Sequence, residues 1–123
     1  MIKYRVGHRK DGCKTVFAYE GTTRVGWLGA CQSLHYLEVQ KVHVLESHRR
    51  QKIATALYEH AARLACEIGK SLASYSWQRN EASDEFWQKQ RRLGRAVVDP
   101  ERSKLLVISC PVSSLTGQRR RKS

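Results

Sequence analysis

The stretch "VHVLESHRRQKIATALYEHA", from Val42 to Ala61, constrains the fold more than any other part of the chain. Its first residues alternate as in a strand, and its later apolar residues have the three- and four-residue spacing of an amphipathic helix. Four residues with cationic or hydrogen-bonding side chains lie where this helix begins: Arg49, Arg50, Gln51 and Lys52. The helix macrodipole disfavours cations at this end. The cluster therefore indicates an anion site, in which these side chains and the first-turn N–H groups bind a multiply charged group such as a pyrophosphate.

Hydrophobic periodicity predicts the other elements of the chain. The expected strands cover Ile2 to Val6, Thr15 to Tyr19, Arg24 to Ala30, His35 to Leu45, Ser71 to Trp77, and Lys104 to Val112. The expected helices run from Ile53 to Ile68, with Gly69 as the stop, and from about Ser83, as the N-cap, to Leu93. This order predicts an α/β (α+β) fold, a mixed sheet with a helix on at least one face.

The strand from His35 to Leu45 changes the parity of its apolar residues. Leu37 and Val39 alternate on one face, but the next apolar pair is Val42 and Val44. One extra residue near Gln40–Lys41, as in a β-bulge, would keep all four on the same face. A strand that is apolar on both faces, in a covered sheet, explains the pattern equally well.

The chain is basic, with 23 Lys and Arg against 11 Asp and Glu, and a net charge of +12. Its length predicts one domain, residues 1–112, followed by a basic, disordered tail, residues 113–123. The tail holds four of the positive charges, so the expected domain keeps +8. The positive electrostatic field of such a domain favours encounters with acidic partners, above all nucleic acid. The alternative is that the charge only keeps the protein soluble.

The four cysteines, Cys13, Cys31, Cys66 and Cys110, lie far apart and form no CxxC pair. This spacing favours reduced thiols and gives no reason to expect a metal site. The sequence has no apolar run near the ~18 residues of a membrane span and no apolar signal-peptide core at its start. We therefore expect a cytoplasmic protein with no membrane partner, and the sequence leaves its oligomeric state open.

The stretch from Val42 to Ala61 resembles motif A of the GNAT superfamily of N-acetyltransferases. In that family a bulged strand leads into a loop of pattern R/Q-x-x-G-x-G/A, and Arg49, Lys52 and Ala54 fall on its three defined positions. The stretch "NEASDEFWQKQRRLGRA" resembles the family's second conserved region, N-x-x-A…FY-x-K-x-G. The resemblance implies a mixed, mostly antiparallel sheet with a bulged central strand and two main helices.

The resemblance also implies an acetyl-CoA-dependent N-acetyltransferase. In that reaction Glu38 takes the proton of the acceptor amine, and the backbone N–H of Val42 stabilises the oxyanion. A solvated strand carboxylate is the alternative for Glu38. The residues that the resemblance assigns to coenzyme binding are Val42, Val44, Arg49, Arg50, Gln51, Lys52, Ile53, Ala54, Thr55, Asn80, Ser83 and Trp87.

Two residues depart from the family pattern. Lys52 replaces the first glycine of the loop, where a small residue lets the backbone approach phosphate. Trp87 replaces the tyrosine that many members use to protonate the leaving thiolate, and an indole is no acid at neutral pH. The substitutes that the sequence offers for this acid are Tyr75, Ser83 and Cys66.

The family's usual first pair of helices is missing, because only about eight residues, "HRKDGCKT", join the first strand to the hairpin. In the family these two helices enclose the acceptor site. Without them the acceptor site is open, which favours a macromolecular acceptor with an acidic surface, such as nucleic acid or a ribonucleoprotein. One alternative is a nucleic-acid-binding protein that has lost catalysis, and another is acyl transfer onto a nucleobase. Trp27 and Trp77 lie on expected strands and are assigned to the core rather than to base stacking.

Overall fold

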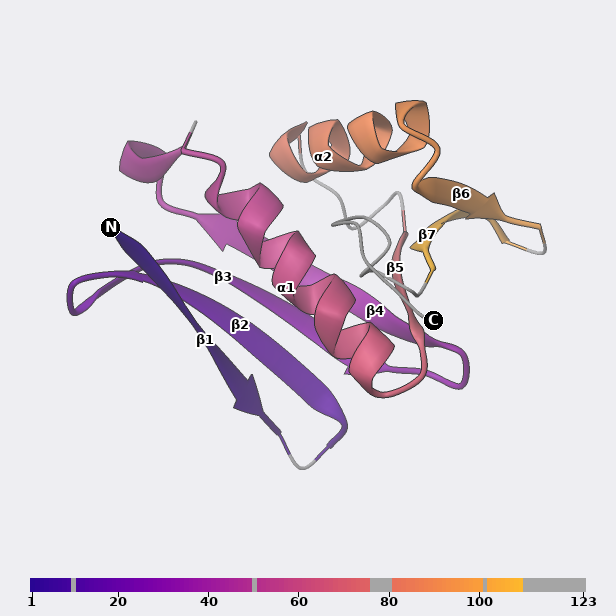
Figure 1. Ribbon diagram of the computed structural model, residues 1–123, viewed down its shortest axis with the longest axis horizontal. Coiled ribbons are helices and arrows are strands. Elements are labelled where there is room, and N and C mark those ends of the chain that lie inside the picture. The colour runs from indigo at the N-terminus through magenta and orange to yellow at the C-terminus, as the bar shows by residue number, and fades with distance from the viewer. Residues whose placement is uncertain (10, 50, 76–80, 101, 110–123) are drawn as a thin grey trace, which may run out of the picture.

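The computed structural model describes residues 1–9, 11–49, 51–75, 81–100 and 102–109, which form a seven-stranded sheet and two α-helices (Figure 1). The elements are β1 (Ile2–His8), β2 (Cys13–Glu20), β3 (Thr23–Gln32), β4 (Tyr36–Val44), the 3₁₀ turn η1 (Glu46–His48), α1 (Ile53–Glu67), β5 (Ser71–Tyr75), α2 (Glu81–Arg92), β6 (Ala96–Asp99) and β7 (Arg102–Ile108). The strand order is β1-β2-β3-β4-β5-β7-β6, and only β4 and β5 are parallel. The predicted mixed, mostly antiparallel sheet is confirmed. The tail, Arg50, Trp77, Asn80 and Cys110 lie outside the described residues.

Helix α1 lies across one face of β2, β3 and β4 (Figure 1). Its predicted apolar stripe is buried, with Ile53, Leu57 and Ala61 each no more than 1% exposed. The helix ends where expected. Gly69 has φ 74°, and the N–H of Lys70 donates to the carbonyl of Ala65 at 2.8 Å.

The predicted bulge in β4 is confirmed. In β3, Gly29 lies opposite Lys41. The next residue, Ala30, lies opposite Val39, so Gln40 is the extra residue. The bulge turns the apolar residues on both sides of it toward one core: Leu37, Val39, Val42 and Val44. The alternative of a strand that is apolar on both faces is wrong.

Three predictions on the second half of the chain need correction. Helix α2 begins at Glu81, so Ser83 lies inside its first turn and is not the N-cap. Strand β6 was not expected, because its four residues are too few to show a period. Its neighbour β7 ends at Ile108, short of the predicted Val112.

The prediction of reduced cysteines is wrong for Cys13 and Cys31, whose Sγ atoms are 2.01 Å apart in a disulfide. The two residues lie directly opposite each other in β2 and β3, a register that sequence spacing does not reveal. Cys66 is also disulfide-bonded. No helix in the described part of the chain is long and apolar enough to cross a membrane. A cytoplasmic location stays a prediction.

The usual first helix pair is absent, as expected, because residues 9–12 join β1 directly to β2. In this turn the N–H of Arg9 donates to the carbonyl of Cys13 at 2.9 Å. Neither helix of the described chain packs on the face of β1–β4 that lies opposite α1. We call this surface the outer face.

Candidate acetyl-transfer site

The sheet splits between β4 and β5. These strands pair only over Tyr36–Glu38 and Ser71–Ala73. From Val39 to Val44, β4 pairs with β3 but with no described residue of β5. The predicted ligand-binding residues Val42 and Val44 lie on this segment, along which no described strand pairs with the second edge of β4.

Beyond β4 the chain passes through η1 to the N-terminus of α1. The first-turn N–H groups of Ile53, Ala54 and Thr55 have no acceptor within the helix. The residue that precedes them, Lys52, makes no side-chain cap to these groups. This helix end offers donors and the positive end of a macrodipole, as an anion site requires.

Lys52 has a left-handed backbone conformation, with φ 60° and ψ 26°. Among the described residues other than glycine, it alone has a positive φ. This conformation explains why the family pattern has glycine at the position. The loop keeps the path that a glycine would give it, and the exposed Lys52 side chain adds a positive charge beside the helix N-terminus.

We expect Lys52→Gly to raise the free energy of unfolding by about 0.5–1 kcal/mol. The left-handed conformation costs a side chain roughly 1–2 kcal/mol, and the extra freedom of glycine in the unfolded chain offsets part of the gain. Urea denaturation measures the change. Gln51→Gly is the matched control: it should destabilise, since Gln51 has no positive φ to relieve. A loss of stability in Lys52→Gly would contradict the expectation.

Arg49 is held at the end of β4. Its Nε donates to the carbonyl of Val44 at 3.3 Å, and its backbone N–H donates to the carbonyl of Glu46 at 3.3 Å. The residue is exposed, as are Gln51 and Lys52. Arg49 and Lys52 thus both lie exposed on the segment that leads into α1.

A contact that the sequence did not predict anchors this loop to β2. His48 Nε2 lies 3.0 Å from Glu20 Oε1, and His48 Nδ1 lies 2.8 Å from the hydroxyl of Ser47. The hydrogen bond with His48, and then its charge, lower the pKa of the Glu20 carboxyl. The sequence gives no signal for the pair, because 28 positions separate the two residues.

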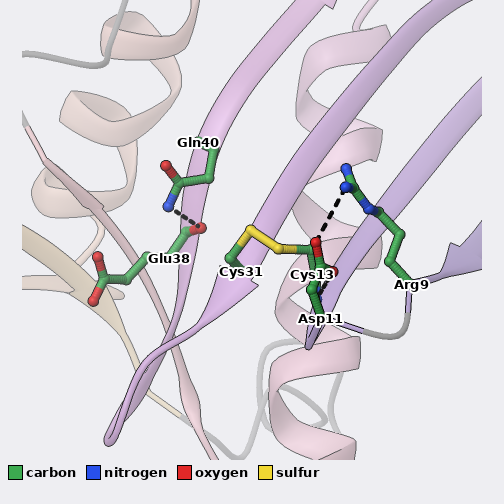
Figure 2. The surroundings of a disulfide bond; sticks show 6 residues. All are labelled: Arg9, Asp11, Cys13, Cys31, Glu38 and Gln40. Carbon is green, nitrogen blue, oxygen red and sulfur yellow. Dashed lines mark hydrogen bonds and ion pairs between the residues drawn. A yellow bond between two sulfur atoms is a disulfide. The ribbon is translucent and has the colours of Figure 1, made fainter.

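Glu38 is the last residue of β4 before the split. It is half-buried and lies between Cys31 of β3 and Ala73 of β5. Figure 2 shows its carboxylate directed away from the disulfide, and the side-chain amide of Gln40 donating to its backbone carbonyl at 3.4 Å. The predicted base and the predicted oxyanion donor, Val42, therefore lie on one strand at the mouth of the same split.

The second conserved region supplies core residues in this structure. Trp87 is fully buried. Its ring packs edge-to-face on both Tyr58 and Phe86, with the ring centroids 5.7 Å apart in each pair. None of its surface is available to a coenzyme here. Cys66 is disulfide-bonded and cannot serve as the thiolate's acid. Ser83 lies in the first turn of α2.

Comparison with known proteins places this site in a family. Residues 2–91 match the model of the acetyltransferase (GNAT) family. The chain belongs to this family. Its membership confirms the recognition made from motif A. No curated protein matches the sequence.

Solved structures share the fold at low sequence identity. PaiA N-acetyltransferase from Thermoplasma acidophilum, in complex with coenzyme A, superposes with a TM-score of 0.61 at 14% identity, over 79% of this chain and 59% of its own length. The AtaT toxin Y144F mutant, bound to the C-terminus of the antitoxin AtaR, superposes with a TM-score of 0.65 at 16% identity, over 88% of this chain and 73% of its own length. The anti-CRISPR protein AcrVA5 superposes with a TM-score of 0.57 at 19% identity, over 80% of this chain and 99% of its own length. The match to AcrVA5 spans nearly the whole of that protein, so the part of the fold that this chain shares with it forms almost all of another protein.

Proposed function

We propose that this chain transfers the acetyl group of acetyl-CoA to an amine of a macromolecular acceptor with an acidic surface. The observation that carries the proposal is the split beside Glu38, which leads to the N-terminus of α1 at Lys52 and borders a sheet face that no described helix covers.

The residues present fit coenzyme A. The open edge of β4 from Val39 to Val44 suits the amide-bearing pantetheine arm. The first-turn N–H groups of α1, with Arg49 and Lys52 beside them, suit the pyrophosphate. Lys52 takes the backbone conformation of the glycine that it replaces, so this departure leaves the path of the loop intact.

The chemistry that the chain contributes lies at the split. The cosubstrate, when bound, would supply an acetyl thioester: its C–S bond breaks as the new amide bond forms, and coenzyme A leaves as a thiolate that takes a proton from solvent. Glu38 takes the proton of the attacking amine, directly or through one water. The backbone N–H of Val42 donates to the acyl oxygen as that oxygen gains negative charge. The half-buried position of Glu38 leaves its carboxylate accessible to an acceptor.

The surroundings of the site support a large acceptor with a negative charge. Residues 9–12 replace the two helices that wall the acceptor site in longer family members, so the outer face is continuous with the region around Glu38. The net charge of +12 attracts acidic partners. A macromolecule with a negative surface fits this open, basic approach.

We expect Arg49→Ala combined with Lys52→Ala to weaken coenzyme A binding by about 100-fold, because each change removes a charge-assisted contact to the pyrophosphate. Isothermal titration on the full chain measures the affinity. Arg63→Ala combined with Arg91→Ala removes two exposed charges elsewhere and should leave the affinity unchanged. Equal losses in both double variants would overturn the pyrophosphate assignment.

The acceptor class is tested with radiolabelled acetyl-CoA in a lysate. Label should accumulate in acid-insoluble material, and nuclease and protease treatments then divide nucleic acid from protein. Label found only in acid-soluble amines would overturn the macromolecular acceptor while leaving the coenzyme site intact.

A further inference from the structure

The outer face carries cations and aromatic rings in register across four strands. The central row consists of Arg5, Phe17, Trp27 and His43, each directly opposite the next. A second row consists of Lys3, Tyr19 and Arg24. A third consists of Gly7, Thr15, Gly29 and Lys41. These three rows contain no carboxylate, so this part of the outer face is basic.

The placement of Trp27 corrects its assignment to the core. Its neighbours along β3, Gly26 and Leu28, are buried on the face that α1 covers, whereas Trp27 is half-buried on the opposite face. Phe17 is half-buried in the same way. Both rings thus keep exposed surface on a face that no described helix covers.

Glycines let these rings lie against the sheet. A Cβ built on Gly7 would come within 3.4 Å of Cε2 of Phe17, and one built on Gly29 within 3.9 Å of Cζ3 of Trp27. Each ring therefore leans over a residue that has no side chain. A ring that lies on the backbone presents its other face outward, which is the orientation that a stacking platform needs.

Cations stand over both rings. Arg24 Cζ is 5.2 Å from the centroid of Phe17, and Lys41 Nζ is 5.7 Å from the centroid of Trp27. Both cationic residues are exposed. A cation–π contact at an exposed site is weaker than the stacking of a base on the same ring, so a base can displace the cation. The displaced group stays within reach of the phosphate that follows the base.

We propose that the outer face binds single-stranded nucleic acid, with bases stacked on Phe17 and Trp27 and phosphates bound by Lys3, Arg5 and Arg24. Exposed rings interleaved with cations match a strand whose bases are unpaired, whereas a duplex hides its base faces and an acidic protein has no bases to stack. Glu38 lies opposite Cys31, one row beyond Gly29 and Lys41, so a strand on this face passes the proposed base. This proposal names the class of the acceptor, and in that respect it rests on the proposed transferase function. The binding of nucleic acid is nevertheless measurable without turnover.

The test is fluorescence anisotropy with a labelled oligouridine of about 15 nucleotides. The full chain should bind it, and should bind a duplex of the same length and an acidic polypeptide (polyglutamate) more weakly. Changing Lys3, Arg5 and Arg24 together to alanine should weaken binding about 10-fold or more, and should reduce the slope of log K against log salt by about 2. Changing Lys89, Arg91 and Arg92, the basic residues in the last turn of α2, removes the same charge elsewhere and should have a much smaller effect.

The stacking contribution is tested with Phe17→Leu combined with Trp27→Leu, which keeps apolar bulk but removes the π faces. This variant should bind about 10-fold or more weakly with an unchanged salt slope. Circular dichroism checks that it folds, and the charge variant keeps the test valid if it does not. No binding of oligouridine, equal losses in the two charge variants, or equal affinity for duplex or polyglutamate would each overturn the proposal. Coenzyme titration of the same variants should be unchanged, so a failure here is distinct from a failure of the transferase assignment.

Discussion

Glu38→Gln should lower the rate of acetyl incorporation by about 10²–10⁴-fold, the usual contribution of a positioned general base. Glutamine keeps the shape of the side chain but cannot take the amine's proton at neutral pH. Because Glu38 lies where β4 and β5 stop pairing, the change touches neither the open edge of β4 nor the N-terminus of α1. Coenzyme affinity should therefore be unchanged, and the loss should fall on turnover alone.

The acid-insoluble label assay and the coenzyme titration together measure this effect. Glu67→Gln, at the exposed end of α1, is the matched control and should retain full activity. Glu38→Asp should recover part of the rate, since a carboxylate remains at a slightly different distance. Full activity in Glu38→Gln would remove Glu38 from the mechanism, whereas lost coenzyme binding would show that it supports the fold of the site.

The elements around the candidate site were predictable because their sequence signals are local. The parity change between Leu37 and Val44 predicted either a bulge or a strand that is apolar on both faces, and the structure has the bulge, with Gln40 as its extra residue. The apolar stripe of α1 and its stop at Gly69 were likewise readable from short windows. In each case one face of an element must be buried, so period alone fixes the orientation.

Features that depend on strand register were not predictable. Cys13 and Cys31 meet because the turn between β2 and β3 sets which residues face each other. The pair of Glu20 and His48 joins elements that are distant in the sequence. Trp27 was assigned to the core because it is an apolar residue on an expected strand. Only the position of α1 decides which face of that strand is buried.

The short β6 and the fully buried Trp87 show a further limit. Four residues with two adjacent valines give no period, so pairing with β7 alone reveals the strand. Trp87 occupies a position that the family pattern assigns to chemistry, yet its contacts with Tyr58 and Phe86 place it between α1 and α2. A motif gives a residue's position, whereas its role depends on which side chains fill the neighbouring space.

Cys13→Ser combined with Cys31→Ser should lower the free energy of unfolding by about 3 kcal/mol. The disulfide closes a loop with a sequence separation of 18, and in the chain-entropy model a loop of this size stabilises the fold by about that amount. For a domain of this size the midpoint temperature should fall by about 10 °C. The strands should keep their register, because β2 and β3 still pair from Lys14 and Ala30 onward to their turn, and β3 still pairs with β4.

Urea denaturation under oxidising conditions compares this double variant with the native chain, and dithiothreitol then separates the two cross-links. Because Cys66 is also disulfide-bonded, a reductant should destabilise the native chain more than the double variant. The effect of reductant on the double variant isolates the contribution of the Cys66 bond. A decrease below about 0.5 kcal/mol in the double variant, within the range of ordinary surface substitutions, would mean that the bond does not constrain the unfolded chain.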